Sequence, residues 1–77
     1  MTAQETYTVW NDDAPSPRTA TLETSDVRLA RLEASTFRQA TICINRPGRG
    51  FQVQFELWRD GKRWNTRGGG GWEQVTI

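Results

Sequence analysis

The sequence predicts an α+β fold, with one antiparallel sheet of four to five strands and one helix packed on one face, in a single domain over residues 1–77. Three observations predict this fold. Apolar and polar residues alternate over residues 51–58, as a strand with one buried face requires. A run of good helix formers lies within residues 25–37. Shorter segments rich in β-branched and aromatic residues lie on both sides of that run.

Residues 51–64, FQVQFELWRDGKRW, predict a hairpin. Asp60-Gly61 is the kind of pair that tolerates positive φ in a two-residue turn, and residues 62–65 return as the partner strand. The alternation assigns one set of side chains to the core (Phe51, Val53, Phe55 and Leu57) and the other to solvent (Gln52, Gln54, Glu56 and Trp58). Phe55 is predicted to be fully buried, so that Phe55→Ala costs roughly 3–5 kcal/mol.

The N-terminal part of the chain predicts two strands. Residues 5–10, ETYTVW, form the first, with Tyr7 and Val9 on one face. A loop containing Pro15 and Pro17 follows, because proline lacks a backbone donor and disfavours helix in the residue before it. Residues 19–22 are expected to return as a short edge strand.

Residues 25–37 are the candidate helix. Ser25 or Thr24 is expected to be the N-cap, with Asp26 in the first turn at the positive end of the helix dipole. The apolar stripe is imperfect, because Leu29 and Leu32 lie on the side away from its members (Val27, Ala30, Ala34 and Phe37). Two alternatives follow: the helix is covered on two sides, or the segment is a strand.

The remaining segments predict strands and loops. Residues 41–46, TICINR, form a strand with Ile42 and Ile44 inward and Cys43 as a small buried or half-buried side chain. The four glycines at 68–71 predict a mobile loop, since such a run has high backbone entropy. It lacks the Lys-Ser/Thr and the following helix of a phosphate-binding loop. Residues 72–77, WEQVTI, resume the strand pattern, with Val75 and Ile77 inward or pairing along an edge.

Composition argues against several classes of function. The chain has no histidine and one cysteine, so it lacks the commonest general base, the usual zinc ligand and the means for an internal disulfide. We therefore expect a protein that is not an enzyme and that needs no cofactor or metal. No apolar run approaches the roughly 20 residues of a membrane span, which predicts a cytoplasmic protein with no membrane partner.

Charge is uneven although the net charge is only +1. Nine of the ten basic residues are arginine, and nine of the ten lie at Arg28 or beyond. Arginine-rich codon usage explains such a bias, and so does a surface built for phosphates or carboxylates.

Basic and aromatic residues coincide in the second half of the chain and form the candidate partner-binding site: Trp58, Arg59, Lys62, Arg63, Trp64, Arg67 and Trp72. Tryptophan beside arginine suits stacked bases and phosphates. It equally suits a protein interface, where these residue types are enriched among hot spots. The structural alternative is that one or two of the tryptophans cap the core and the arginines only solvate the sheet.

The order of a first strand, a helix ending ARLEAS, a strand, a hairpin and then DGKRW (residues 60–64) resembles the small phage anti-CRISPR proteins of the type I-F class. The likeness covers residues 19–64, and DGKRW is its one near-literal match. It implies a non-catalytic inhibitor that occupies a guide-RNA surveillance complex in the host cytoplasm, with Lys62 and Arg63 as contacts. This chain departs from the pattern by continuing into the glycine run and a further strand.

The leading interpretation is a non-enzymatic, phage-encoded inhibitor that blocks a host nucleic-acid-handling complex by protein contact, its partner being a host protein or ribonucleoprotein. The first alternative is a direct single-stranded nucleic-acid binder that uses the same arginines and tryptophans, against which the low net charge argues. The second is a structural protein that forms a homo-oligomer through its helix.

Overall fold

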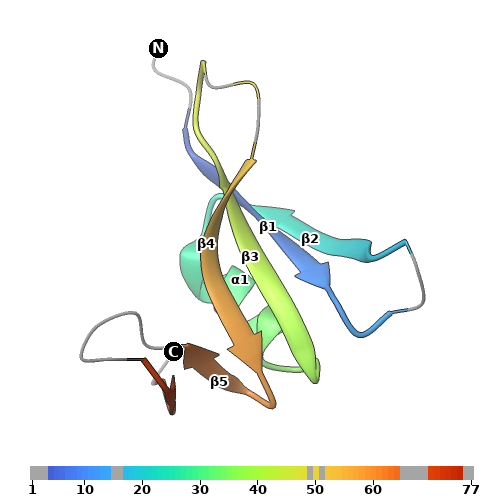
Figure 1. The fold of residues 1–77 in the computed structure, drawn as a ribbon. Coiled ribbons are helices and arrows are strands. Elements are labelled where there is room, and N and C mark those ends of the chain that lie inside the picture. Colours follow the sequence, from blue (N-terminus) through green and yellow to red (C-terminus); the bar gives the residue numbers. More distant parts are fainter. Residues whose placement is uncertain (1–3, 15–16, 49, 51, 65–69, 76–77) are drawn as a thin grey trace.

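The computed structural model describes residues 4–14, 17–48, 50, 52–64 and 70–75. Over these residues the chain forms a six-stranded antiparallel sheet with one helix against one face (Figure 1). The elements are β1 (Thr6–Asn11), β2 (Thr19–Thr24), α1 (Val27–Ala34), β3 (Gln39–Asn45), β4 (Gln52–Arg59), β5 (Lys62–Trp64) and β6 (Trp72–Glu73). The α+β class is confirmed. The expected number of strands is wrong, because the short β5 and β6 extend the sheet to six.

The strands lie in the order β2-β1-β3-β4-β5-β6. β1 lies between β2 and β3, and β2 is an edge strand, as expected for residues 19–22. Val9 is fully buried and Tyr7 packs against the core, so the predicted face of β1 is confirmed. α1 lies across β1, β2 and β3, and among the residues that the structure describes no helix covers the opposite face of the sheet, which we call the helix-free face (Figure 1).

Residues 27–34 are helical, which removes the strand alternative for this segment. The N-cap is Asp26 rather than Ser25 or Thr24: its carboxylate accepts from the Arg28 amide at 2.9 Å. The helix ends early because the hydroxyls of Ser35 and Thr36 donate to backbone carbonyls of the last turn, an alternative to further helix.

The inner face of α1 is made of small residues. Ala30 and Ala34 are buried, and Phe37 packs against the core from beyond the helix end. Leu29 and Leu32 are exposed on the far side, as the periodicity predicts. These two exposed leucines are compatible with an oligomer formed through the helix, which stays a prediction.

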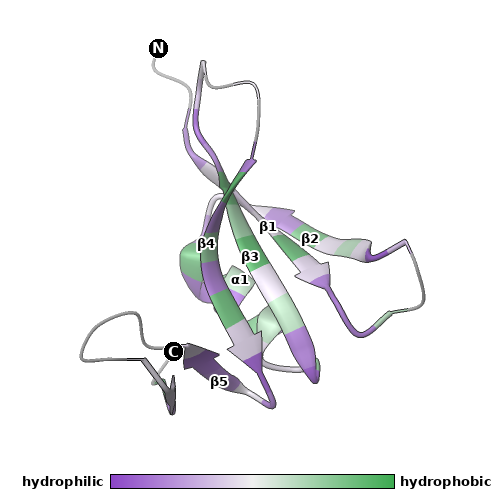
Figure 2. Cartoon of the chain, in the orientation of Figure 1, coloured by the Kyte–Doolittle hydropathy of each residue, from purple (hydrophilic) through white to green (hydrophobic). Residues whose placement is uncertain are grey.

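The core lies between α1 and the middle of the sheet. Its buried members are Val9, Ala30, Ala34, Ala40, Ile42 and Trp58. Figure 2 shows the hydrophobic residues of β1 and β3 side by side in the centre, with hydrophilic residues toward the strand ends. Ile42 and Ile44 are buried as expected.

β4 carries a bulge that reverses the expected assignment of its faces. Ile42 lies opposite Glu56, whereas the next residue of β3, Cys43, lies opposite Gln54, so Phe55 is the extra residue. An extra residue shifts the alternation by one position. From Glu56 onward, the side chains that were expected to face solvent therefore face the helix.

Three predicted positions on β4 are corrected by this bulge. Phe55 is 39% exposed, so the prediction that it is fully buried is wrong. Trp58, expected on the outward face, is only 2% exposed and belongs to the core. Glu56, also expected outward, has a side chain that is 8% exposed.

The other members of the alternation divide on either side of the bulge. Gln52 and Gln54 are exposed as expected. Val53 lies opposite Ile44 on the helix side of the sheet, as expected, but its side chain is exposed. Leu57 lies on the helix-free face and is half-buried, contrary to its expected place in the core. Phe51 lies outside the described residues.

The hairpin turn has the predicted geometry. Asp60 and Gly61 have φ of 53° and 78°, the positive values that a two-residue turn between twisted strands requires. The turn packs under the end of α1, because a Cβ at Gly61 would stand 3.5 Å from the Ser35 carbonyl oxygen. Residue 65 of the predicted partner strand lies outside the described residues.

The C-terminal tail returns to the sheet through β6. Val75 packs against the core as predicted, and Ile77 lies outside the described residues. Of the glycine run, Gly68 and Gly69 also lie outside them. Gly70 and Gly71 are described and have positive φ. The predicted mobility of the whole run stays a prediction.

Candidate binding surface

Strand pairing divides the predicted site residues between the two faces of the sheet. Trp58 lies opposite Ala40 in the core and opposite Arg63 on β5, so Trp58 and Arg63 face the helix side. Side chains alternate along a strand. Arg59, its partner Lys62, and the facing pair Trp64 and Trp72 therefore lie on the helix-free face. Arg67 lies outside the described residues.

Two of the seven predicted site residues have interaction partners within the fold. The Trp58 indole is buried and donates to Glu56 at 3.2 Å. Arg63 is held between two carboxylates, at 3.1 Å from Glu56 and 2.9 Å from Glu73. The resemblance implied Arg63 as a contact with a partner, but its guanidinium is already engaged within the chain.

Glu56 is the centre of this ion-pair network. The Arg31 guanidinium approaches it to 2.7 Å from α1, so the network ties the helix to β4 and β5. Burial is the largest influence and opposes ionisation of Glu56. The hydrogen bonds from Arg31, Trp58 and Arg63, with the charge of Arg31, outweigh burial and hold the pKa of Glu56 below its ordinary value.

The pKa of Arg63 is raised, mainly by its hydrogen bond to Glu73, with burial opposing and Glu56 adding to the effect. Sequence patterning missed the network, because the apparent alternation placed Glu56 in solvent.

Four predicted residues do come together, and we call them the tryptophan surface: Arg59, Lys62, Trp64 and Trp72. Trp64 and Trp72 are 37% and 40% exposed. Their ring centroids are 5.0 Å apart at 69°, an edge-to-face packing. Among the residues that the structure describes, no carboxylate pairs with Arg59 or Lys62. The surface thus presents aromatic area beside two cations without internal partners.

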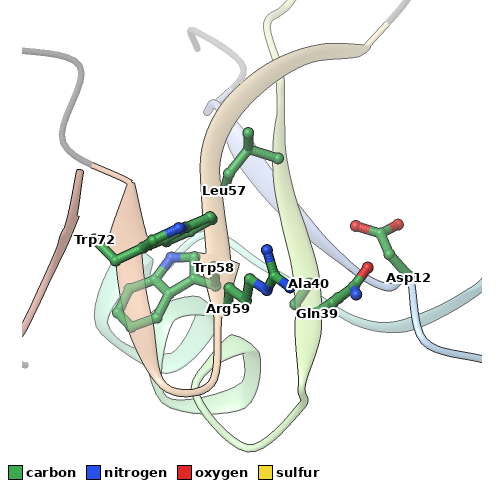
Figure 3. Close-up of a pocket in the computed structure, with 7 residues that line it drawn as sticks. All are labelled: Asp12, Gln39, Ala40, Leu57, Trp58, Arg59 and Trp72. Carbon is green, nitrogen blue, oxygen red and sulfur yellow. The ribbon is translucent and has the colours of Figure 1, made fainter. Parts of the chain in front are cut away.

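A pocket of about 180 Å³ adjoins this surface. It is lined by Asp12, Gln39, Ala40, Leu57, Trp58, Arg59 and Trp72. In Figure 3 the Trp72 indole extends toward Leu57 on one side, the Arg59 side chain extends toward Gln39, and Asp12 lies beyond Gln39. The pocket therefore combines an aromatic wall with three polar side chains.

Sequence reasoning missed the pocket residues Gln39, Leu57 and Asp12. Gln39 comes to the pocket because it lies opposite Arg59 in the sheet. Asp12 follows the end of β1, and its amide donates to the Gln39 carbonyl at 3.0 Å. These three positions are distant in sequence and converge only through the strand order, so no local pattern announces them.

A second aromatic–cation pair lies on the helix-free face. The Arg18 guanidinium lies 4.7 Å from the centre of the Trp10 ring and 3.1 Å from the Asp12 carboxylate. The same carboxylate accepts a hydrogen bond from Thr41, and the Trp10 indole donates to Gln52 at 3.0 Å. The contacts with Arg18 and Gln52 hold the Trp10 side chain against the helix-free face of the sheet.

Cys43 lies on the same face, opposite Thr8 on β1, and is buried as predicted. Burial raises the pKa of its thiol, with smaller opposing and reinforcing effects from Arg18, Asp12 and Trp10. The thiol is thus held in the protonated form, in keeping with a packing role.

Two features are absent from the described part of the chain. It holds no group of three or more metal-ligating side chains. It also holds no helix with the length and apolar character that crossing a bilayer requires.

Gly70 is required by the packing of Trp64. Its φ is 88°, and a Cβ there would lie 2.6 Å from Cζ2 of the Trp64 indole. We expect Gly70→Ala to displace Trp64 from Trp72 and to reduce the near-ultraviolet circular dichroism of the pair, in addition to a backbone cost of about 1–2 kcal/mol.

Gly48→Ala is the matched control for this prediction. Gly48 has a similar φ of 80°, but a Cβ there meets nothing within 4 Å. It should carry the backbone cost alone and leave the tryptophan signal unchanged. Equal spectra for the two variants would contradict the proposed contact.

No protein-family model, curated protein or solved structure matches the chain in the comparisons. Its function must therefore be argued from its own geometry.

Proposed function

We propose that the protein is a non-enzymatic domain that binds single-stranded nucleic acid through the tryptophan surface. The observation that supports this most is the exposed, mutually packed Trp64 and Trp72 beside Arg59 and Lys62. Unpaired bases stack on such rings, and guanidinium and ammonium groups neutralise the phosphates between them. α1 lies against the other face of the sheet, so these four side chains are on the face away from the helix (Figure 1).

The charge distribution sets the kind of binding to expect. Four arginines are committed to ion pairs with carboxylates: Arg18, Arg31, Arg46 and Arg63. Arg59 and Lys62 remain on the tryptophan surface, with Arg18 stacked on Trp10 nearby. Binding should therefore depend more on stacking than on charge. With two phosphates neutralised, by Arg59 and Lys62, log Kd should change with log salt at a slope of about 1.4.

Fluorescence anisotropy of a labelled eight-nucleotide oligo(dT) tests this proposal. Trp64→Ala should weaken binding by about 1–3 kcal/mol, the contribution of stacking one base. Lys62→Glu should also weaken it and lower the salt slope. Arg28→Glu is the control, because Arg28 is exposed on α1 and carries the same charge away from the surface. No measurable binding at low salt, or equal losses from Lys62→Glu and Arg28→Glu, would refute the proposal.

Docking onto a protein is the second candidate. The surface fits it because tryptophan and arginine are the residue types enriched at interface hot spots. It also fits the resemblance to type I-F anti-CRISPR proteins at one position, since Lys62 of DGKRW is exposed next to the turn. Under this candidate the protein is a phage-encoded inhibitor whose surface meets a host surveillance complex.

The second candidate makes a separate prediction. The protein should co-purify with a type I-F surveillance complex after nuclease treatment, and Arg59→Glu with Lys62→Glu should abolish this. Arg63 is unsuitable for charge reversal, because the change would break its ion pairs with Glu56 and Glu73. Arg28→Glu with Arg38→Glu is the control, both residues being exposed. A complex that binds neither the parent nor any variant would exclude the inhibitor function.

A further inference from the structure

We infer that the pocket beside Trp72 binds one unpaired guanine base of the bound strand. This inference rests on the proposed nucleic-acid function and adds a base preference to it. The tryptophan surface by itself predicts no such preference, because every base has a face that stacks.

The size of the pocket limits what it accepts. At about 180 Å³ it is smaller than the roughly 300–1,000 Å³ of pockets for drug-sized ligands. It suits a single planar group lying against the Trp72 indole, with Leu57 as the second apolar wall (Figure 3).

The polar lining favours a base over an aromatic amino-acid side chain. Arg59, Gln39 and Asp12 converge on the pocket from three separate segments. A phenyl ring would displace water from these groups without replacing its hydrogen bonds, which costs free energy. A nucleobase carries donors and acceptors on its edges and can form hydrogen bonds with these three side chains.

Arg59 selects guanine among the bases. A guanidinium has only donors and fits the paired acceptors O6 and N7 of guanine, whereas adenine places an amino donor beside its N7. The Asp12 carboxylate and the Gln39 amide oxygen are the acceptors available for the amino and imino donors of guanine. The Asp12 oxygens already accept from Arg18 and Thr41, which fixes the carboxylate in place.

The experiment compares oligo(dT) of eight nucleotides carrying one central dG, dA or 7-deaza-dG. The parent protein should bind the dG strand at least about fivefold more tightly than the dA strand. The 7-deaza-dG strand, which lacks the N7 acceptor, should lose most of that advantage. Arg59→Lys keeps the charge but not the bidentate donor geometry, so it should remove the preference for the dG strand over the dA strand, whatever its effect on the affinity for oligo(dT) itself. Lys62→Arg is the control and should keep the preference.

The outcomes separate this inference from the proposed function. Binding of oligo(dT) with equal affinity for the dG and dA strands would overturn the guanine pocket alone. A preference that survives in Arg59→Lys would likewise overturn it, because another group would then read the base. Failure of every oligonucleotide to bind would overturn both.

Discussion

Trp58→Ala is expected to lower the free energy of unfolding by about 3–5 kcal/mol, the usual cost of removing a large buried aromatic side chain. Trp58 is 2% exposed and packs in the core against α1. A domain of this length has a total stability of only about 4–12 kcal/mol, so the variant loses much of it. Urea denaturation followed by far-ultraviolet circular dichroism measures the loss.

Phe55→Ala is the matched control for Trp58→Ala. Phe55 is 39% exposed and its main contact is the Tyr7 ring, with centroids 5.2 Å apart. An aromatic pair of this kind contributes about 0.5–1.5 kcal/mol. A larger loss from Phe55→Ala than from Trp58→Ala would mean that β4 has no bulge and that its other face is the core.

Glu56→Gln is expected to lower the free energy of unfolding by about 3 kcal/mol. It removes the one carboxylate shared by Arg31 and Arg63, and breaking a buried ion pair costs about 3–5 kcal/mol. The lower end applies because the two arginine side chains are 24% and 29% exposed and regain some hydration. Thermal or urea unfolding near neutral pH measures the effect.

The same substitution changes the dependence of stability on pH. Because the pKa of Glu56 is lowered in the folded state, the unfolded chain binds more protons at this group as the pH falls. Its contribution is therefore complete above the ordinary value of 4.5 and is lost as the pH falls through the folded-state pKa. The stability difference between the parent and Glu56→Gln should shrink below that value.

Glu73→Gln is the control for both measurements. Among the described residues Glu73 pairs only with Arg63, and its side chain is 37% exposed, so its loss should cost less than about 1 kcal/mol. Equal losses from the two substitutions would show that Glu56 is not the centre of the network.

Local pattern predicted most elements of the fold. The signals that predicted them depend only on residues that are close in sequence. They are the β-branched residues of the strands, the turn pair Asp60-Gly61 and the apolar stripe of α1. The inner face of β4 was not predictable in this way, because the bulge at Phe55 arises from the pairing of β4 with β3. Assigning side chains to the two faces of a sheet by alternation assumes that the strands pair without a bulge. One extra residue reverses the face of every residue that follows it.

The candidate site shows the same limit. Composition brought out the tryptophans and arginines, and Arg59, Lys62, Trp64 and Trp72 do share one face. Composition did not show that Arg63 and Trp58 differ from these four residues. Arg63 is ion-paired with Glu56 and Glu73, and Trp58 is buried in the core with residues of α1. Gln39 and Asp12 have no local signal at all.

The resonances of the four tryptophan indole N–H groups in a ¹H–¹⁵N correlation spectrum test the proposed function most directly. Two indoles are hydrogen-bonded within the fold, Trp10 to Gln52 and Trp58 to Glu56. On titration with oligo(dT), the resonances of Trp64 and Trp72 should shift progressively while the backbone amides of α1 stay in place. Shifts confined to backbone amides of α1 would place the binding site on the helix side and contradict the account.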